Sequence, residues 1–372
     1  MISSLLKYVW VRVPLISGLF YKPRKRTYLF LPINGAGLGH LTRLLAVAHR
    51  LKRAQPDAEI VFFTTSIGVA LVHREGFMCH HVPPAALLNT GAIDWNKLFC
   101  KSLKNALDVH RPSVLVFDGT IPYLGLQRVM HSYRKIRYAW IKRGLYKEGV
   151  DFARLETLSK GFEVVISPGE LDSKYDENVA GSRFQQIEPV SLLDAGDLLP
   201  KDTARRILRL DPSKSCVYLQ LGAGNINGIH GVQDKIIELL KKKGFQVVLG
   251  QSPISLSPKP DLRADSVIVD YPNSKYFNAF DFAVLAGGYN SVCEAVTLGL
   301  PAIFLPNTET GADDQLKRVL SARAIGNYEV IREYSDAGFE QAVEKLLTNE
   351  RLESGNKQSN GAETAAKLIG QL

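Results

Sequence analysis

Cysteine is scarce in this chain of 372 residues, and no two cysteines form a paired motif. The four cysteines are Cys79, Cys100, Cys216 and Cys293; none belongs to a C-x-x-C pair, and three lie in or beside apolar segments. Disulfide-stapled scaffolds and structural zinc sites depend on closely spaced cysteines. The thiols are therefore predicted to be free and buried, as in proteins of a reducing compartment.

The sequence also lacks an uninterrupted apolar run of the length that crosses a membrane. Residues 1–26 are rich in apolar side chains, but Lys7, Arg12 and Pro14 interrupt them, and no signal-peptide cleavage pattern follows. A basic cluster, KPRKR, ends this stretch at residues 22–26. Two predictions stay open: the extension lies on an anionic membrane surface, or it packs on the protein itself.

Acidic residues are the minority charge, with 37 Asp and Glu against 46 Lys and Arg, for a net charge of +9. This excess favours anionic partners such as nucleotides, phospholipids, phosphorylated substrates or nucleic acid, without choosing among them. The 45% hydrophobic and 22% charged composition is typical of a globular protein with a large core.

Apolar strand patterns alternate with amphipathic helix patterns along the chain. TYLFLPI is followed by LTRLLAVAHRLKR and AEIVFFTT, and SCVYLQLGAG opens a second series of the same kind near residue 216. Such alternation predicts parallel sheets covered by helices. We expect an α/β protein with two doubly wound, Rossmann-like domains, residues 27–198 and 199–372, facing a cleft where the strands end.

The first candidate site is the loop GAGLGHLTR at residues 35–43. Its G-x-G-x-G-H spacing is not the dinucleotide fingerprint, but Gly37 and Gly39 let a substrate approach the backbone. His40 is a candidate general base, and Asp118, at the end of the strand SVLVFDG, is a candidate partner for its ring. The plainer alternatives are a histidine that only opens a helix and an ordinary Asp-Gly turn.

A second group of candidates follows the strand that ends at Gly287 and Gly288. Asn290 and Ser291 open a helix whose free amides suit a diphosphate, and Glu294, one turn further, suits the hydroxyls of a ribose. The alternative is a capping box formed by Ser291 and Glu294.

Two further loops face the same predicted cleft. Asp314 and Gln315 combine an acid and an amide that suit sugar hydroxyls, with a polar helix start as the alternative. Gly222 and Gly224 end the first strand of the second domain and suit contact with a diphosphate, or form a plain turn.

Together these motifs resemble those of the GT-B nucleotide-sugar glycosyltransferases. The stretch from Gly287 to Gln315 is similar to the donor signature of the UDP-glycosyltransferases. The first position of that signature, often histidine, is Ala286, and the aromatic is tyrosine where plant members usually have tryptophan. The segment GLGHLTRLLAVAHRL is similar to the acceptor-side motif of the superfamily, including the lipid-linked N-acetylglucosaminyltransferase of peptidoglycan synthesis. The matching donor-signature residues are Gly288, Tyr289, Asn290, Ser291, Glu294, Gly299, Pro301, Asp314 and Gln315.

The resemblance implies roles for these residues. His40 would be the catalytic base with Asp118 as its partner, on an acceptor side that includes Gly37, Gly39 and Arg43. On the donor side, it implies that Glu294 holds the ribose, Asn290 and Ser291 the diphosphate, and Asp314 and Gln315 the sugar, with Gly222, Gly224 and Gly288 beside them.

The expected reaction is an inverting sugar transfer from a nucleoside diphosphate sugar, with UDP the expected nucleotide, to a hydroxyl acceptor that is a sugar or lipid-linked. No metal is expected, since no Asp-x-Asp pair is present, and no resident cofactor is expected, since the glycine spacing is not the dinucleotide fingerprint. The expected setting is cell-envelope or exopolysaccharide synthesis in the cytoplasm, with the inner membrane face as a candidate contact.

Two other functions compete with this one. The stretch GHLTR, with Arg43, is similar to the Gly-His-x-x-Arg motif of the nucleotide-sugar hydrolases of nonulosonate synthesis, which use water as acceptor. A non-catalytic membrane- or nucleic-acid-binding protein ranks below both, because the basic and aromatic stretch at residues 131–147 lies in no recognised nucleic-acid module, and no nucleic-acid partner is expected.

Overall fold

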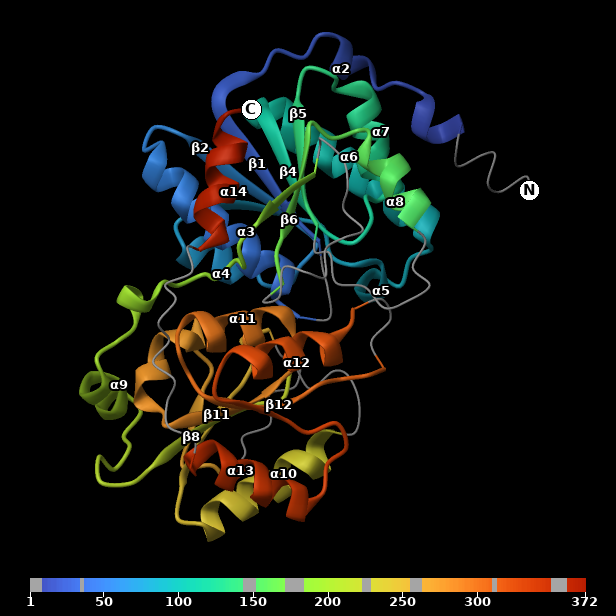
Figure 1. The fold of residues 1–372 in the computed structure, drawn as a ribbon. Coiled ribbons are helices and arrows are strands. Elements are labelled where there is room, and N and C mark those ends of the chain that lie inside the picture. The colour runs from blue at the N-terminus through green and yellow to red at the C-terminus, as the bar shows by residue number, and fades with distance from the viewer. Residues whose placement is uncertain are drawn as a thin grey trace.

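A computed structural model describes residues 9–33, 37–142, 152–170, 184–222, 229–254, 263–309, 313–348 and 360–372. Two parallel sheets, one above the other in Figure 1, each carry helices on both faces. The first sheet has the strand order β3-β2-β1-β4-β5-β6-β7 and the second the order β10-β9-β8-β11-β12-β13. This arrangement confirms the predicted pair of doubly wound α/β units.

The first sheet is built from strands whose side chains are apolar on both faces, as covering helices on both sides require. Its core residues come from strands and helices alike, for example Phe30, Phe62 and Leu44 on one face and Phe117 and Trp140 on the other. Its elements are α2 (Ile16–Leu19), β1 (Arg24–Pro32), α3 (Gly39–Ala54), β2 (Glu59–Thr64), α4 (Val69–Arg74), β3 (Met78–His81), α5 (Ala85–Leu88), α6 (Ala92–His110), β4 (Pro112–Asp118), α7 (Leu124–Ser132), β5 (Arg137–Ile141), α8 (Phe152–Ser159), β6 (Val164–Pro168) and β7 (Phe184–Ile187).

The second sheet repeats this logic with shorter strands. Tyr218 and Phe304 belong to the core on one face, and Val217 and Ile303 to the core on the other. Its elements are η2 (Ala195–Asp197), α9 (Lys201–Ile207), β8 (Cys216–Gln220), α10 (Ile229–Lys242), β9 (Gln246–Gly250), β10 (Ser266–Ile268), η3 (Asn273–Ala279), β11 (Phe282–Ala286), α11 (Tyr289–Thr297), β12 (Ala302–Leu305), α12 (Gln315–Ile325), β13 (Tyr328–Val330) and α13 (Asp336–Thr348).

The last helix, α14 (Gly361–Gly370), departs from the predicted division of the chain. Ala362, Ala365 and Ile369 join the core of the first sheet and pack against α3, as the red helix in the upper part of Figure 1 shows. A Cβ at Gly361 would collide with the carbonyl oxygen of Glu188, so glycine permits this close approach. Helix α14 therefore packs with the first unit, although the range 199–372 assigned it to the second.

The thiol predictions agree with the structure. All four cysteines are free; Cys100, Cys216 and Cys293 are buried, and Cys79 is partly buried. Among the helices in the described ranges, none combines the length and the apolar character needed to cross a membrane.

Candidate active site

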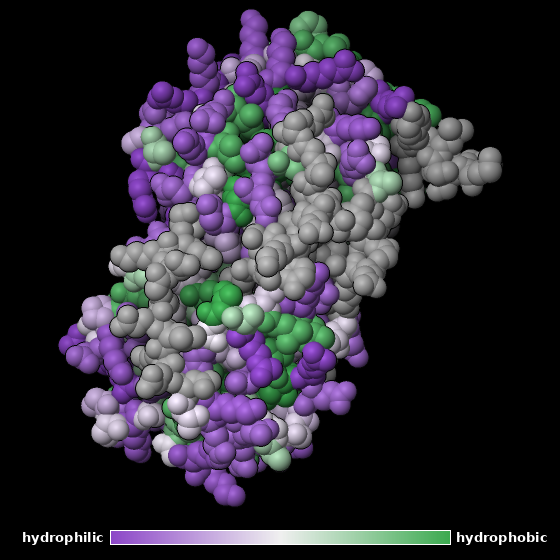
Figure 2. Space-filling model, in the orientation of Figure 1, coloured by the Kyte–Doolittle hydropathy of each residue, from purple (hydrophilic) through white to green (hydrophobic). Residues whose placement is uncertain are grey.

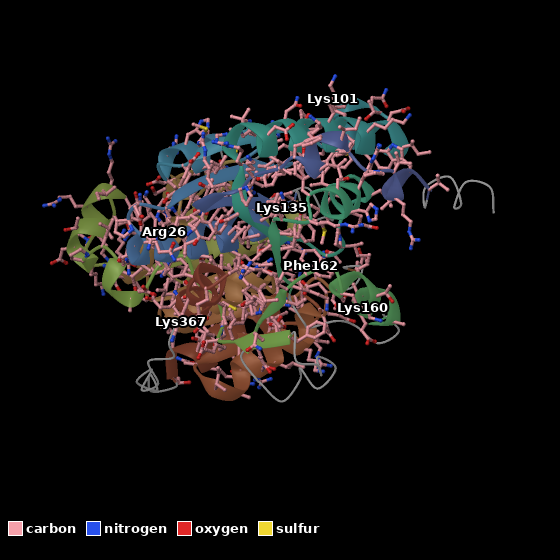
Figure 3. All side chains as sticks on the ribbon, turned by 90° about the horizontal axis from the view of Figure 1, so that it is seen from above. Arg26, Lys101, Lys135, Lys160, Phe162 and Lys367 are labelled. Carbon is pink, nitrogen blue, oxygen red and sulfur yellow. The ribbon has the colours of Figure 1, made fainter. Side chains whose placement is uncertain are left out.

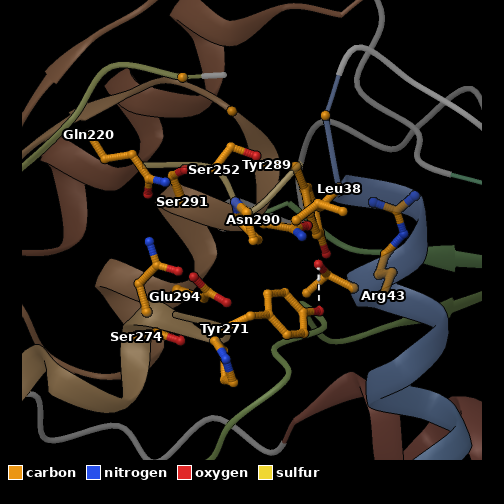
Figure 4. Close-up of a pocket in the computed structure, with 18 of the residues that line it drawn as sticks. Leu38, Arg43, Gln220, Ser252, Tyr271, Ser274, Tyr289, Asn290, Ser291 and Glu294 are labelled. Atoms are coloured by element: carbon orange, nitrogen blue, oxygen red, sulfur yellow. Dashed lines mark hydrogen bonds between the residues drawn. The ribbon is translucent and has the colours of Figure 1, made fainter. Parts of the chain in front are cut away.

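A cavity of about 400 Å³ lies at the carboxyl ends of the strands, where the two units meet (Figure 4). One wall comes from the start of α3, and the other from the start of α11 and the segment that leads into η3. A hydrogen bond at the cavity joins the two units: the Tyr271 hydroxyl donates to Thr42 Oγ1 at 2.9 Å, the dashed line in Figure 4. Residues from both halves of the chain therefore face the same space.

On the first wall, strand order brings His40 and Asp118 together. β1 and β4 are adjacent and in register, with Pro32 opposite Asp118, so the loop after β1 starts α3 beside the end of β4. His40, the second residue of α3, has a side chain that is 17% exposed, and its Nδ1 lies 2.7 Å from Asp118 Oδ1. The contact that the sequence could not establish is thus present in the structure.

Arg43 completes this group from the next turn of α3. Its Nε and Nη2 donate to the two oxygens of Asp118 at 2.9 and 2.6 Å, and its Nη2 lies 3.0 Å from His40 Nδ1. Burial by itself would raise the pKa of Asp118, but the charges of Arg43 and His40 outweigh it and lower the pKa. Asp118 is therefore held as a buried carboxylate behind His40.

On the second wall, α11 starts directly at the cavity. Gly288 is the N-cap, no side chain caps the helix, and Asn290 and Ser291 occupy its first turn and line the cavity. The capping-box alternative is wrong, because Ser291 is the third residue of the helix and not its N-cap. The backbone amides of this first turn are the kind of group that binds a diphosphate.

Glu294 lies one turn further along α11 and also lines the cavity (Figure 4). Burial raises the pKa of its carboxyl to about 7, and the neighbouring Ser274 hydroxyl acts in the opposite direction. A carboxyl that is only half ionised near neutral pH gains from a ligand that donates hydrogen bonds to it.

The structure separates the two residues of the predicted sugar pair. Gln315 lines the cavity, and its Oε1 accepts a hydrogen bond from the Asn307 amide at 2.9 Å. Asp314 does not line the cavity; its carboxylate caps α12 by accepting a hydrogen bond from the Lys317 amide at 3.0 Å. The preceding acid, Asp313, takes the place at the cavity wall.

The glycines divide in a similar way. Gly37, Gly39, Gly222 and Gly288 line the cavity, and an added Cβ at each would meet nothing within 4 Å. Gly222 has a φ of +101°, a backbone conformation that favours glycine. The prediction for Gly224 lies outside the described residues.

Sequence reasoning missed the polar cluster that joins the two units behind the cavity. Arg318, fully buried on α12, donates to both oxygens of Glu170 at 2.7 and 2.9 Å and to Asp313 at 2.6 Å. No local pattern marks this pair, because Glu170 and Arg318 lie 148 positions apart.

Tyr289 lies between the two arginines. Its ring centroid is 5.4 Å from the Arg43 guanidinium carbon and 5.7 Å from that of Arg318. Its hydroxyl accepts a hydrogen bond from the Val190 amide at 3.1 Å. Tyr289, the first residue of α11, therefore contacts Arg43, which binds Asp118 on the first wall.

Acids and histidines near the cavity do not form a metal centre: within the described ranges no group of His, Cys, Asp and Glu is arranged to hold a metal ion. The cavity is instead defined by a His–Asp–Arg group on one wall and by a helix start with the partly buried carboxyl of Glu294 on the other.

Comparison with solved structures places this fold among known proteins. The glycosyltransferase of kitacinnamycin matches 93% of the chain, over 98% of its own length, with a TM-score of 0.65 and 17% identity. The UDP-GlcNAc 2-epimerase of Neisseria meningitidis matches 93% of the chain, over 98% of its own, at a TM-score of 0.62 and 14% identity. Acinetobacter baumannii MurG matches 93% of the chain, over its whole length, at a TM-score of 0.58 and 14% identity. The fold is the GT-B fold.

Curated sequences add distant relatives with one recurring name. The UDP-N-acetylglucosamine–N-acetylmuramyl-(pentapeptide) pyrophosphoryl-undecaprenol N-acetylglucosamine transferase of Nocardioides sp. is 27% identical over 300 residues, which cover 73% of this chain and 76% of the relative. The enzyme of the same name from Listeria welshimeri is 22% identical, with 91% of this chain and 97% of the relative covered. No family model matches the chain. The chain shares the GT-B fold with these solved structures, and these transferases are its distant homologues.

Proposed function

We propose that the protein is an inverting glycosyltransferase that moves a sugar from a UDP-sugar to a hydroxyl acceptor without a metal ion. One observation carries the proposal: the His40–Asp118 pair and the open start of α11 face each other across one cavity. A base and a site for a departing anion on opposite walls are what in-line displacement at an anomeric carbon needs.

In this proposal the acceptor hydroxyl attacks the anomeric carbon from the side of His40. Because His40 Nδ1 faces Asp118, Nε2 is the ring nitrogen that takes the hydroxyl proton. Asp118 fixes the ring orientation and stabilises the imidazolium that forms. The bond from the new oxygen to the anomeric carbon forms as the bond to the diphosphate breaks, so the configuration inverts.

The leaving diphosphate takes the electron pair of the broken bond. The free amides at the first turn of α11, around Asn290 and Ser291, provide a fixed positive field for that charge. This field is the reason for proposing a reaction without a metal ion. Glu294 accepts hydrogen bonds from the ribose, and Gln315 together with Asp313 contacts the donor sugar.

The proposed acceptor is a sugar hydroxyl, free or lipid-linked, in cell-envelope or exopolysaccharide synthesis in the cytoplasm. The names of the curated relatives support UDP-N-acetylglucosamine as the first donor to test. The alignments cover at least three quarters of the length of both relatives.

The first experiment is a calorimetric titration of the full chain with UDP, TDP, GDP and ADP in the presence of a chelator. We expect saturable binding of UDP, weakened by Glu294→Ala and nearly unchanged in His40→Ala. In a transfer assay His40→Ala should lose activity while it still binds UDP. Wild-type turnover in His40→Ala would overturn the assignment of the base, and binding of none of the nucleotides would overturn the donor site.

A nucleotide-sugar hydrolase is the second candidate, and Arg43 is the observation that favours it. Arg43 completes a Gly-His-x-x-Arg sequence, and its guanidinium contacts both His40 and Asp118. The two functions differ in what happens to UDP-N-acetylglucosamine alone. A hydrolase releases UDP and free sugar at its full rate, whereas a transferase releases UDP rapidly only after a hydroxyl acceptor is added.

A further inference from the structure

The N-terminal extension is anchored on the first unit as far as the structure describes it. Residues 9–21 run along α7, where the Leu15 amide donates to Ser132 Oγ at 3.0 Å. The hydroxyls of Ser17 and Tyr133 share a hydrogen bond of 2.7 Å. The extension therefore packs on the protein itself, one of the two outcomes that its sequence left open.

Packing does not hide its apolar side chains. Trp10 and Leu15 turn toward the core of the first unit. Outside, the segment carries a series of exposed large apolar side chains, here called the apolar strip, and Figure 2 shows green at the upper edge of the molecule, where Figure 1 has α2. The exposed members of this apolar strip are Val9 (51%), Val13 (48%), Ile16 (75%), Leu19 (63%) and Phe20 (77%).

Cations follow the apolar strip in the sequence, and one of them, Arg26, pairs with Asp57. Residues 1–26 contain six Lys and Arg and no Asp or Glu. Lys22, Arg24, Lys25 and Arg26 follow the strip directly and are exposed. In the view from above in Figure 3, Arg26, Lys101 and Lys135 lie well apart from one another.

We propose that the face formed by residues 9–26 docks on an anionic phospholipid bilayer. Ile16, Leu19 and Phe20 enter the interface between headgroups and acyl chains, and the cations of residues 22–26 lie at the level of the anionic headgroups. A second copy of the chain fits this face less well. A symmetric contact would bring together two copies of residues 9–26, which carry five cations and no acid, and like charges repel.

If the proposed function holds, the position of this face also limits how far the acceptor hydroxyl lies from the membrane. β1 begins at Arg24, beside the docking face, and ends at Pro32, beside the cavity. Nine residues at about 3.3 Å each make a strand of about 30 Å. In the docked enzyme the cavity therefore lies about 30 Å from the bilayer surface. The acceptor hydroxyl then belongs to a free sugar, or to a membrane-linked sugar that extends that far from the bilayer.

The test is co-sedimentation of the full chain with phosphatidylcholine vesicles that contain or lack phosphatidylglycerol. The main variant is Ile16→Glu/Leu19→Glu/Phe20→Glu. The matched control is Leu87→Glu/Ile93→Glu, which changes two side chains that are each 53% exposed on the same unit, at α5 and α6. Calorimetric UDP binding by each variant shows whether its cavity is intact.

We expect the wild type and the control to bind phosphatidylglycerol vesicles in a salt-sensitive way. The main variant should bind at least about tenfold more weakly, since two or three large apolar groups no longer leave water. Three results would overturn the proposal: no binding by the wild type, equal binding by the main variant, or loss of binding in the control alone. A dimer in solution that only the main variant disrupts would also overturn it and assign the face to a second copy.

Discussion

Replacing Arg43 with methionine tests how its charge controls the proposed base. In the structure the Arg43 guanidinium neutralises Asp118 and lies 3.0 Å from His40 Nδ1. Methionine keeps an apolar stem but removes the charge, so Asp118 faces His40 alone. The imidazole then holds its proton more tightly. The carboxyl groups of Glu294 and Asp313 on the cavity wall are unchanged by this variant.

The direction of the change follows from the sign of the charge that is lost. A unit charge at hydrogen-bonding distance moves a titration by about one to three pH units. We therefore expect the acidic limb of kcat/KM to move to higher pH by about one to two units, with most of the activity recovered in alkaline buffer. Removing one partner of a buried ion pair also costs about 3–5 kcal/mol of the free energy of unfolding.

The assay is initial-rate release of UDP from a UDP-sugar across the pH range, below the melting temperature of the variant, with circular dichroism as the check on folding. Asp118→Asn is the matched counterpart. It removes the negative charge beside His40, so its acidic limb should move to lower pH and its maximum should fall.

Two results would refute this reasoning. A fall in kcat/KM by the same factor at every pH, with the acidic limb unmoved, would mean that Arg43 only supports the fold. A shift of the acidic limb to lower pH in Arg43→Met would mean that the sign of its effect on His40 is wrong.

Three further predictions concern the second unit. Glu294→Gln should raise the free energy of unfolding by up to about 3 kcal/mol at pH 8 and leave it nearly unchanged at pH 4, as read by urea titration. The reason is that the folded carboxyl keeps its proton up to about pH 7 and the unfolded one does not, so the cost of burying the charge builds between the two pKa values. An equal gain at both pH values would contradict this. Arg318→Met should lower the free energy of unfolding by about 3–5 kcal/mol, because Glu170 is left buried without its partner, and a melting temperature equal to that of the wild type would refute it. Asp313→Asn should weaken binding of the UDP-sugar more than that of UDP, whereas Asp314→Asn, which keeps a capping side chain, should change neither by calorimetry.

The sequence could predict the features that depend on neighbouring residues. Alternating apolar and amphipathic segments predicted two parallel α/β units, because the spacing of apolar residues within a strand or a helix indicates which of its side chains are buried. The donor signature predicted that Gly288, Asn290, Ser291 and Glu294 follow one strand, and the structure brings all four to one cavity. Their spacing along a single helix start is local and is fixed once α11 forms.

Capping and burial could not be predicted in the same way. The pattern Ser-x-x-Glu permits a capping box, yet α11 begins two residues before Ser291 because the strand ends at Ala286 and Gly288 becomes the N-cap. The sequence likewise predicted that Asp314 and Gln315 act together. In the structure the Asp314 carboxylate caps α12, and Asp313 and Gln315 line the cavity.

By itself, the sequence determined the fold class, the GT-B resemblance and most of the residue types at the cavity, since these follow from periodicity and from motifs within single segments. Only the tertiary structure decided which of these residues touch. The contact of His40 with Asp118 depends on the adjacency of β1 and β4, and the ion pair of Glu170 with Arg318 depends on how the two units meet. The position of α14 on the first unit has the same cause. Each of these contacts joins residues far apart in the chain, and only the free energy of packing the whole molecule selects them.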